Sequence, residues 1–420
     1  MRLGLNLIHR RLGLTTILSK LFVLLKTDAM RGTLAYYLLF ICMGLGMAML
    51  GPTLPSLAEQ TQTPVGQLGS SLFLAGPIGV VVGVLLGGRL FDRVRGHPAL
   101  GVAQLISAAS ILCVPLIPSV WVLMVVLAVK GAADGFINAG ANTLLVWTHK
   151  DKSSPYMNGL HFFFGLGAFL APFLVAQVVE IQGGYRWAYW ALAVLGAMAG
   201  VYLLSLKHSP QPQHTERSSA EEGTRVYYPL VIAAMLFLFF YVGAEIAFSG
   251  WIYTYAFTLQ LADAATAAYM TSAFWLSFTI GRLISIPLAL RLTPQRMIWI
   301  ALLGCLSILG VAAILPASST LVWIMAPVLG FCMAPIWPSG FTLAGRSLKL
   351  TARVSTIILQ GDSFGGMVLP WLVGQVLDAT GPQAMIYLVL ASLIFNMAAF
   401  VAMLRFRRTA PDQAVVVSAS

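Results

Sequence analysis

Charged residues are scarce in this chain of 420 residues: they make up 9% of the sequence, and only 14 residues are acidic. A soluble globular domain carries about 25% charged residues, so the deficit excludes an ordinary soluble fold. Hydrophobic residues make up 59% of the chain. Apolar runs of about twenty residues, long enough to cross a bilayer as a helix, recur along it. The short alternating segments of a membrane β-barrel are missing. The sequence therefore predicts an all-α membrane protein with many spans.

Signatures of catalysis and of metal binding are also missing. The four cysteines, Cys42, Cys113, Cys305 and Cys332, fall inside apolar runs without metal-ligand spacing. Such cysteines are typically small buried apolar residues. Neither a GxxxxGK[ST] nucleotide-binding loop nor a catalytic motif occurs. We therefore expect no enzyme activity, no metal, no cofactor and no drive by ATP.

Positive charge lies almost entirely on one side of the expected membrane spans. The 25 Lys and Arg residues fall in the N-terminal segment, in the turns after every second span and at the C-terminal end, with three exceptions: Lys130, Arg186 and Arg282. Cytoplasmic loops carry an excess of Lys and Arg. We therefore expect both termini in the cytoplasm. This distribution accounts for the net charge of +11 without any nucleic-acid partner.

Twelve spans are expected, and one long polar loop divides them six and six. The expected spans are 34–58, 67–90, 98–117, 119–147, 156–181, 185–206, 228–257, 265–290, 297–316, 319–344, 354–376 and 383–404. The expected domains are a basic N-terminal segment 1–32, a six-helix bundle 33–206, a cytoplasmic linker 207–227, a second bundle 228–406 and a tail 407–420. Residues 1–29 leave three interpretations open: a basic interfacial helix, a targeting segment, or an extension ahead of a start at Met30.

The fourth span carries an unusual polar stripe. Lys130, Asp134, Asn138 and Asn142 recur every four residues, which places them along one face of a helix. Polar groups within a membrane helix must face protein or water, because each would cost several kcal/mol in lipid. The stripe therefore predicts the wall of a solute pathway.

The turn after the second span contains a motif with fixed offsets. It reads GRLFDRVRGH from Gly88 to His97. It resembles the signature G-x-L-x-D-R-x-x-G-[RK] of major facilitator transporters, with His97 in the last basic place. The resemblance implies a major facilitator fold of two six-helix bundles around a central cytoplasmic loop. It also implies that Gly88, Asp92, Arg93 and Gly96 form a cytoplasmic gate and do not bind the solute.

Three further stretches resemble one branch of that superfamily. GANTLLVW, LHFFFGLGAFLAPFL and GAEIAFSGWIYTYAF are similar to fucose–proton symporters and, more closely, to the sodium-dependent glucose transporter-like proteins of animals. The resemblance implies a neutral polyhydroxylated solute such as a hexose, moved with Na⁺ or H⁺ as the coupling ion or without coupling. The acid of the fucose symporters falls on Asn138 here, which departs from their scheme of proton symport. We expect a monomer in a bacterial inner (plasma) membrane.

Candidate solute-binding residues are the planar polar and aromatic side chains within the spans, since sugars bind to polar groups and to aromatic faces. These candidates are Asn138, Asn142, Gln360, Trp251, Tyr253, Tyr255, Trp275 and Trp337. Membrane proteins also place Trp and Tyr at the lipid interfaces. Asn138 and Asn142 are therefore the stronger candidates.

Candidate ion-coupling residues are the ionisable side chains within the spans, each of which is costly in lipid. They are Lys130, Asp134, His161, Glu245 and Asp362. Structural roles are the alternatives. Lys130 and Asp134 could neutralise each other one helical turn apart. Glu245 could pair with Lys130 or Arg282, Asp362 could serve helix packing, and His161 could be a satisfied buried histidine.

Two other functions remain open at this point. The first is an efflux pump for amphipathic drugs or cations, because the same turn motif occurs in such antiporters and Glu245 would suit a cationic solute. The second is a membrane sensor that transports nothing, which would need a signalling domain. The linker and the tails are short for such a domain.

Overall fold

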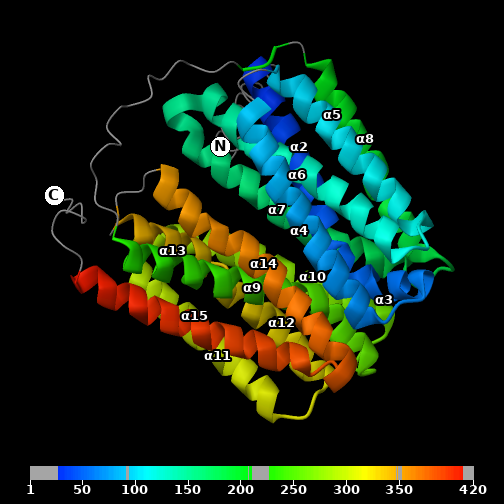
Figure 1. Cartoon of the computed structure of the whole chain (residues 1–420), viewed down its shortest axis with the longest axis vertical. Coiled ribbons are helices and arrows are strands. Elements are labelled where there is room, and N and C mark those ends of the chain that lie inside the picture. The colour runs from blue at the N-terminus through cyan, green and yellow to red at the C-terminus, as the bar shows by residue number, and fades with distance from the viewer. Residues whose placement is uncertain are drawn as a thin grey trace, which may run out of the picture.

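The computed structural model describes residues 27–90, 94–206, 208–210, 227–346, 348 and 352–409, and nearly all of them are helical (Figure 1). Twelve helical segments are long and apolar enough to cross a membrane. The fold is therefore the all-α membrane architecture that the sequence predicts. Most of the expected N-terminal segment, of the linker and of the tail lies outside the described residues.

Two six-helix bundles make up the molecule (Figure 1). The first contains α2 (Asp28–Ala48), α3 (Leu50–Thr61), α4 (Val65–Leu90), α5 (Gly96–Cys113), η1 (Val114–Leu116), α6 (Val120–His149), η2 (Lys150–Lys152), α7 (Ser153–Val178) and α8 (Gly184–Ser205). The second contains α9 (Tyr228–Thr258), α10 (Ala264–Ala289), α11 (Pro294–Ile314), α12 (Ser319–Met333), α13 (Ile336–Gly345), α14 (Ala352–Thr380) and α15 (Ala384–Thr409). The domain boundaries named above remain predictions.

Proline interrupts two of the spans. The first span is broken at Met49 into α2 and α3. Pro52 explains the break, because it has no N–H to donate to the carbonyl of Ala48 one turn earlier. The tenth span is broken between α12 and α13 near Pro335, and Pro338 likewise cannot donate to Ala334. The first span also begins earlier than predicted, at Asp28, because the Thr27 hydroxyl accepts a hydrogen bond from Met30 N.

We call the end of the molecule where α8 ends and α9 begins the linker end, and the other the opposite end. In Figure 1 the two bundles meet near α3, at the opposite end, and lie further apart toward the linker end. Helix α4 packs on α14, and α7 packs on α10, across the boundary between the bundles. These two helix pairs hold the bundles together.

Glycines let α4 and α6 pack with their backbones in contact. A Cβ on Gly83 of α4 would lie 1.9 Å from the carbonyl oxygen of Ala132, and one on Gly79 would lie 2.0 Å from that of Ala128. On α6, a Cβ on Gly135 would lie 2.2 Å from the carbonyl oxygen of Val80. Small residues at such interfaces allow the close approach that drives helix association in lipid. This packing fixes α6, the helix of the polar stripe.

We predict that Gly83→Ala destabilises the protein by about 1–3 kcal/mol, because the added methyl group forces α4 away from α6. Gly310→Ala is the matched control, since a Cβ at Gly310 of α11 would meet no described atom within 4 Å. Thermal unfolding in detergent measures both variants. Equal melting temperatures for the two would contradict the close-packed interface.

Candidate functional site

A cavity of about 230 Å³ lies between the two bundles, and we call it the central cavity. Helices α2–α8 line it from the first bundle, and α9, α10 and α14 line it from the second. Most of the lining is apolar, including Met43, Phe73 and Ile246. The polar side chains that line it are Lys130, Asp134, Tyr189 and Ser249. A solute in this cavity would contact both bundles at once.

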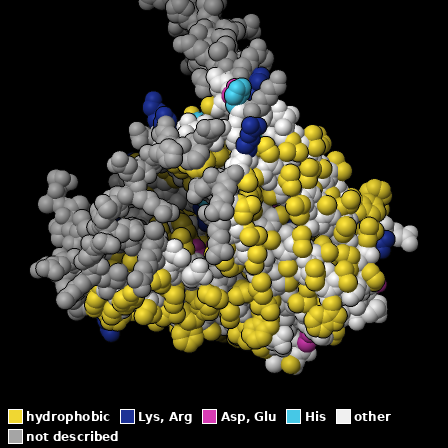
Figure 2. Space-filling view, turned by 45° about the horizontal axis from the view of Figure 1, so that its top comes forward, with side chains coloured by type: hydrophobic (Ala, Val, Ile, Leu, Met, Phe, Trp, Pro, Cys, Tyr) yellow, Lys and Arg dark blue, Asp and Glu magenta, His cyan; other side chains and the backbone are white. Residues whose placement is uncertain are grey.

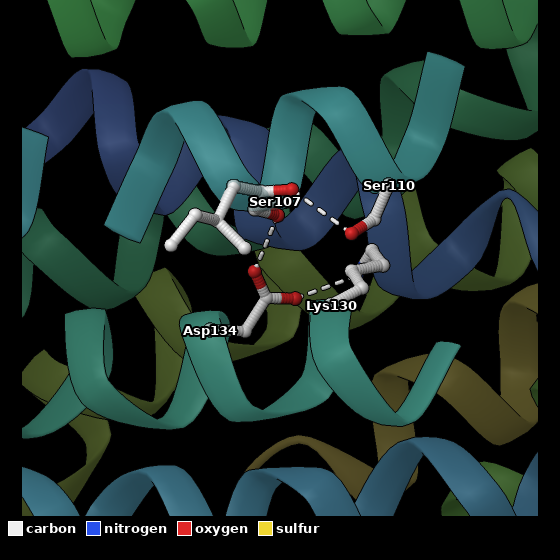
Figure 3. Close-up of polar contacts among 5 residues, drawn as sticks. Ser107, Ser110, Lys130 and Asp134 are labelled. Carbon is white, nitrogen blue, oxygen red and sulfur yellow. Dashed lines mark hydrogen bonds and ion pairs between the residues drawn. The ribbon is translucent and has the colours of Figure 1, made fainter. Parts of the chain in front are cut away.

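An ion pair dominates the polar lining of the central cavity (Figure 3). The Lys130 ammonium donates to Asp134 Oδ2 at 2.5 Å, and the Ser107 hydroxyl of α5 donates to Asp134 Oδ1 at 2.8 Å. Lys130 is 9% and Asp134 8% exposed. Removing one partner would leave the other charge buried alone, at a cost of about 3–5 kcal/mol. Lys130 and Asp134 neutralise each other, as the structural interpretation predicts. They also line the cavity, as a coupling site would require.

Gly46 lies directly against the Lys130 side chain of this ion pair. A Cβ on Gly46 of α2 would lie 2.9 Å from Lys130 Cε and 3.0 Å from Lys130 Nζ. Both contacts are tighter than van der Waals contact permits. The absence of a side chain at Gly46 therefore lets the lysine stem reach along α6 to Asp134.

The two asparagines of the stripe bind each other further along α6. Asn142 Nδ2 donates to Asn138 Oδ1 at 2.8 Å and to the Asn138 carbonyl oxygen at 2.7 Å. Both side chains are half-buried. Neither Asn138 nor Asn142 is among the described residues that line the central cavity. The stripe therefore divides into a charged part at the cavity and an amide part toward the linker end.

A second group of ionisable residues lies in the other bundle. Glu245 of α9 is 8% exposed and directly precedes Ile246, which lines the cavity. Of the ion pairs formed by described residues, none includes Glu245. Arg282 of α10 lies near enough to interact with it electrostatically, and the Arg282 guanidinium carbon also lies 4.7 Å from the Phe278 ring centroid. Glu245 is therefore a buried carboxyl beside the cavity without a direct cationic partner among these residues.

Asp362 of α14 accepts a hydrogen bond from an aromatic candidate. The Trp337 indole N–H donates to Asp362 Oδ2 at 2.8 Å, and the Trp337 ring stacks on Phe341 at 5.5 Å. Asp362 Oδ1 is buried without a partner among the described groups. Gln360 is half-buried and lies two residues before Asp362, toward a different face of α14. Trp337 and Asp362 are thus brought together, and none of the three candidates is among the described lining of the central cavity.

The other aromatic candidates separate into cavity and packing positions. Trp275 of α10 is 2% exposed and lines the central cavity. Trp251 is fully buried, donates to the Pro370 carbonyl oxygen at 3.0 Å and packs on Phe73 of the other bundle. Tyr253 and Tyr255 are buried, and neither is among the described lining residues. Trp275 is thus the aromatic candidate that a solute in this cavity would touch.

His161 of α7 lies at the boundary between the bundles. Its ring packs edge-on against Phe40 of α2, with ring centroids 6.1 Å apart. It also lies close enough to Arg282 of the other bundle for an electrostatic interaction. Figure 2 shows a hollow on one side of the molecule, with acidic and basic side chains visible inside it.

Hydrogen bonds close the two bundles on each other toward the opposite end. Asp378 of α14 accepts from Gly66 N at 2.9 Å and from Gln67 N at 2.8 Å, at the first turn of α4. A carboxylate there satisfies unpaired N–H groups and complements the helix dipole. The Ser70 hydroxyl donates to the Trp371 carbonyl oxygen at 2.9 Å. The Gln177 amide of α7 also donates to the Tyr269 hydroxyl of α10, so hydrogen bonds between described residues hold the bundles closed on each other at this end.

The expected gate motif is only partly described. Gly88 lies near the end of α4, and Gly96 begins α5, where an added Cβ would lie 2.7 Å from Leu144 Cδ2. Asp92 and Arg93 lie outside the described residues. The gate role of this motif therefore remains a prediction.

The sequence reasoning missed three residues that the structure places at these sites: Gly46, Ser107 and Asp378. Ser107 carries no signal in the sequence, because serine is common in membrane helices. Asp378 is one of only 14 acidic residues. Its scarcity could have singled it out, but its partners lie more than 300 positions away in the chain.

Two helical bundles with a cavity between them are the architecture of a membrane transporter. The Major Facilitator Superfamily profile matches residues 36–359, and the chain belongs to this superfamily. The sodium-dependent glucose transporter 1A of Mus musculus is 31% identical to it over 399 residues, which cover 86% of this chain and 93% of the mouse protein. Proteins of this kind are transporters and not enzymes.

Solved structures show the same fold. A D-xylose-proton symporter superposes with a TM-score of 0.76 at 14% identity, over 92% of this chain and 99% of that protein. A bacterial homolog of the human lysosomal transporter Spinster, in an inward-facing and unoccupied conformation, gives a TM-score of 0.75 at 10% identity, over 94% of this chain and 100% of that one. The predicted major facilitator fold is confirmed.

We predict that Asp378→Ala loosens the opposite end, because two hydrogen bonds to a charged acceptor are lost. In a protein whose four native cysteines are replaced by alanine, labelling of Ser249→Cys by a membrane-impermeant maleimide, added from the opposite side, should become about tenfold faster. Asp263→Ala is the matched control. Asp263 accepts from Thr266 N at 2.7 Å and caps α10 within one bundle.

The Thr266 side chain, and then the Thr266 backbone N–H, lower the pKa of Asp263 by hydrogen bonding, so at neutral pH the cap is formed by the charged carboxylate. Its loss should cost about 1 kcal/mol of stability without faster labelling. Equal labelling rates for the Asp378→Ala and Asp263→Ala proteins would contradict the role of Asp378 in closure.

Proposed function

We propose that this transporter moves a small neutral polyhydroxylated solute, a hexose-like sugar, by alternating access, and that a gradient of Na⁺ or H⁺ drives it. The observation that carries the proposal is the central cavity between the bundles, with an ion pair and an indole ring in its lining. The identity of 31% to a sodium-dependent glucose transporter supports a sugar as the solute.

The ion pair and Trp275 supply both kinds of contact that a sugar needs. The Asp134 carboxylate can accept hydrogen bonds from hydroxyl groups, while Lys130 and Ser249 can donate to hydroxyl oxygens. Charged groups form hydrogen bonds of about 1.5–3 kcal/mol, stronger than those between neutral groups. The Trp275 ring can cover the apolar C–H face of the sugar. Asn138 and Asn142 remain proposed contacts at a later point of the route, toward the linker end.

Alternating access requires that one end closes as the other opens. The close contacts in the middle of the boundary suit a pivot: a Cβ on Gly165 would lie 2.6 Å from Thr279 Oγ1, and one on Gly51 would lie 2.7 Å from the Gly250 carbonyl oxygen. In the proposed cycle the Asp378 hydrogen bonds break and the bundles rock about these contacts. If the termini are cytoplasmic, as the sequence predicts, the conformation described here is the inward-facing one.

The proposed coupling residue is Glu245. It is buried beside the cavity, and a carboxyl in such a place can take up and release a proton as the bundles move. His161 and Asp362 are further proposed coupling residues. Arg282 lies close enough to interact electrostatically with Glu245 and His161, and Glu245 lies close enough to interact with Asp362. The gate motif of Gly88, Asp92, Arg93 and Gly96 remains the proposed latch, which would hold the bundles together at the linker end in the outward-facing conformation.

One feature favours a second candidate function, efflux of amphipathic drugs or cations. Most of the central cavity is lined by apolar side chains, which would suit such solutes better than a sugar. Glu245 would then attract the cationic group. The sugar remains the main proposal, because the similarity to the glucose transporter extends over nearly the whole chain.

Uptake into proteoliposomes tests the proposal and separates these functions. We expect saturable entry of labelled hexose, with accumulation above the external concentration under an inward Na⁺ or H⁺ gradient. Accumulation of a lipophilic cation without any hexose entry would favour the efflux pump. Transport of neither solute class would favour the non-transporting sensor and would contradict the proposal.

A substitution tests the coupling residue. Glu245→Gln should reduce the accumulation ratio of the solute to about 1, because the neutral amide cannot bind a proton, while exchange of solute across the membrane continues. Glu59→Gln, an exposed acid at the end of α3, is the control and should behave as wild type. Undiminished accumulation by the Glu245→Gln protein would remove Glu245 from the coupling role.

A further inference from the structure

We propose that the Lys130 ammonium occupies a cation site of the central cavity and acts there as a tethered substitute for a coupling Na⁺. The ammonium donates to Asp134 Oδ2, and the Ser107 hydroxyl donates to Asp134 Oδ1, so the proposed site is the Asp134 carboxylate with the Ser107 hydroxyl beside it. Carboxylate, hydroxyl and water oxygens are the ligands that hard cations prefer. In this chain the cation that neutralises Asp134 is part of the protein.

The geometry makes the substitution permanent through the transport cycle. Lys130 and Asp134 lie one turn apart on α6, and Ser107 and Gly46 belong to α5 and α2 of the same bundle. Rocking of one bundle against the other therefore leaves all four residues in place. A soluble cation would exchange with the solution each time the cavity opened, but the tethered ammonium remains bound.

The site is also built to hold the ammonium. Lys130 is 9% exposed, and a side chain at Gly46 would push against the end of the lysine where it now lies. Figure 3 shows the Lys130 side chain running toward Asp134 along the face of α5 that carries Ser107 and Ser110. The Ser107 hydroxyl binds the second carboxylate oxygen of Asp134. Each oxygen of the carboxylate thus has a partner that belongs to the first bundle.

A consequence follows for ion coupling, and it rests on the proposed transport function. A Na⁺ gradient has no free site at Asp134, so coupling through this carboxylate is absent and is left to other ionisable groups, such as the buried carboxyl groups of the second bundle. In this respect the chain would differ from a carrier that holds Na⁺ at an unpaired cavity carboxylate. The lysine, and not the carboxylate, is then the residue that determines the coupling ion at this site.

Removing the ammonium should uncover the cation site, and Na⁺ binding can be measured without any solute. The experiment uses the purified full-length chain in detergent, with NaCl compared with choline chloride at equal ionic strength. The readout is the melting temperature, because a cation that binds only the folded state raises it. The proteins compared are wild type, Lys130→Ala, Lys130→Gln and the double variant Lys130→Ala/Asp134→Asn.

We expect Na⁺ to raise the melting temperature of the Lys130→Ala or Lys130→Gln protein by about 3 °C or more beyond its effect on wild type. The double variant should lose this gain, since it lacks the carboxylate. The proposal is overturned if neither lysine variant gains a Na⁺ response over wild type, or if the double variant keeps it. It is also overturned if wild type shows a Na⁺ response that Asp134→Asn removes.

These outcomes are independent of the proposed solute. Absence of hexose uptake by the wild-type protein would contradict the proposed function and leave the cation result unchanged. Conversely, hexose uptake together with a Na⁺-insensitive Lys130→Ala protein would overturn only the tethered cation.

Discussion

The cost of a polar group inside a bilayer is the constraint on which this structure depends. Each charge or amide within a span must find a partner or water, because lipid offers neither. Lys130 meets this requirement with Asp134, and Asn142 meets it with Asn138, in both cases on the same helix. Because these partners are local, the first bundle can move without exposing a bare charge.

Close helix packing and the polar contacts between bundles have different roles. Within the first bundle, glycines of α4 and α6 bring backbones into contact, which makes the bundle a stiff unit. Between the bundles, the contacts toward the opposite end are hydrogen bonds to a carboxylate and to carbonyl oxygens. Such bonds can be exchanged for bonds to water at little net cost. The molecule therefore combines rigid halves with a boundary that can open.

The sequence predicts the membrane spans well, because hydropathy and the positive-charge asymmetry act over whole segments. Apart from the first span, which begins at Asp28, helix ends fall within a few residues of the expected limits. The candidate site is predicted less completely. The period of the stripe places Lys130, Asp134, Asn138 and Asn142 on one face, but it cannot tell which of them reach the cavity. That depends on α5 and on Gly46, whose positions follow from tertiary packing.

Aromatic residues show the same limit. Trp251 and Trp275 are equally good solute contacts by composition, yet Trp251 is a packing residue against Phe73 and Trp275 lines the cavity. The contact of Asp378 with Gly66 joins residues at the two ends of the chain, and a single sequence has no signal for such a pair. Residue type and helical period indicate which side chains are unusual within a membrane span. Their partners, and whether they line the cavity, are determined by tertiary packing.

The central claim is that the cavity becomes accessible from alternate ends as the bundles rock. Spin labels at two pairs of positions test it most directly: the half-buried Ser71 with the exposed Thr380 at the opposite end, and the exposed Ser154 and Arg291 at the linker end. In liposomes with saturating hexose, the account predicts a population in which the first distance lengthens while the second shortens. Distances that both stay constant, or that change in the same direction, would contradict it.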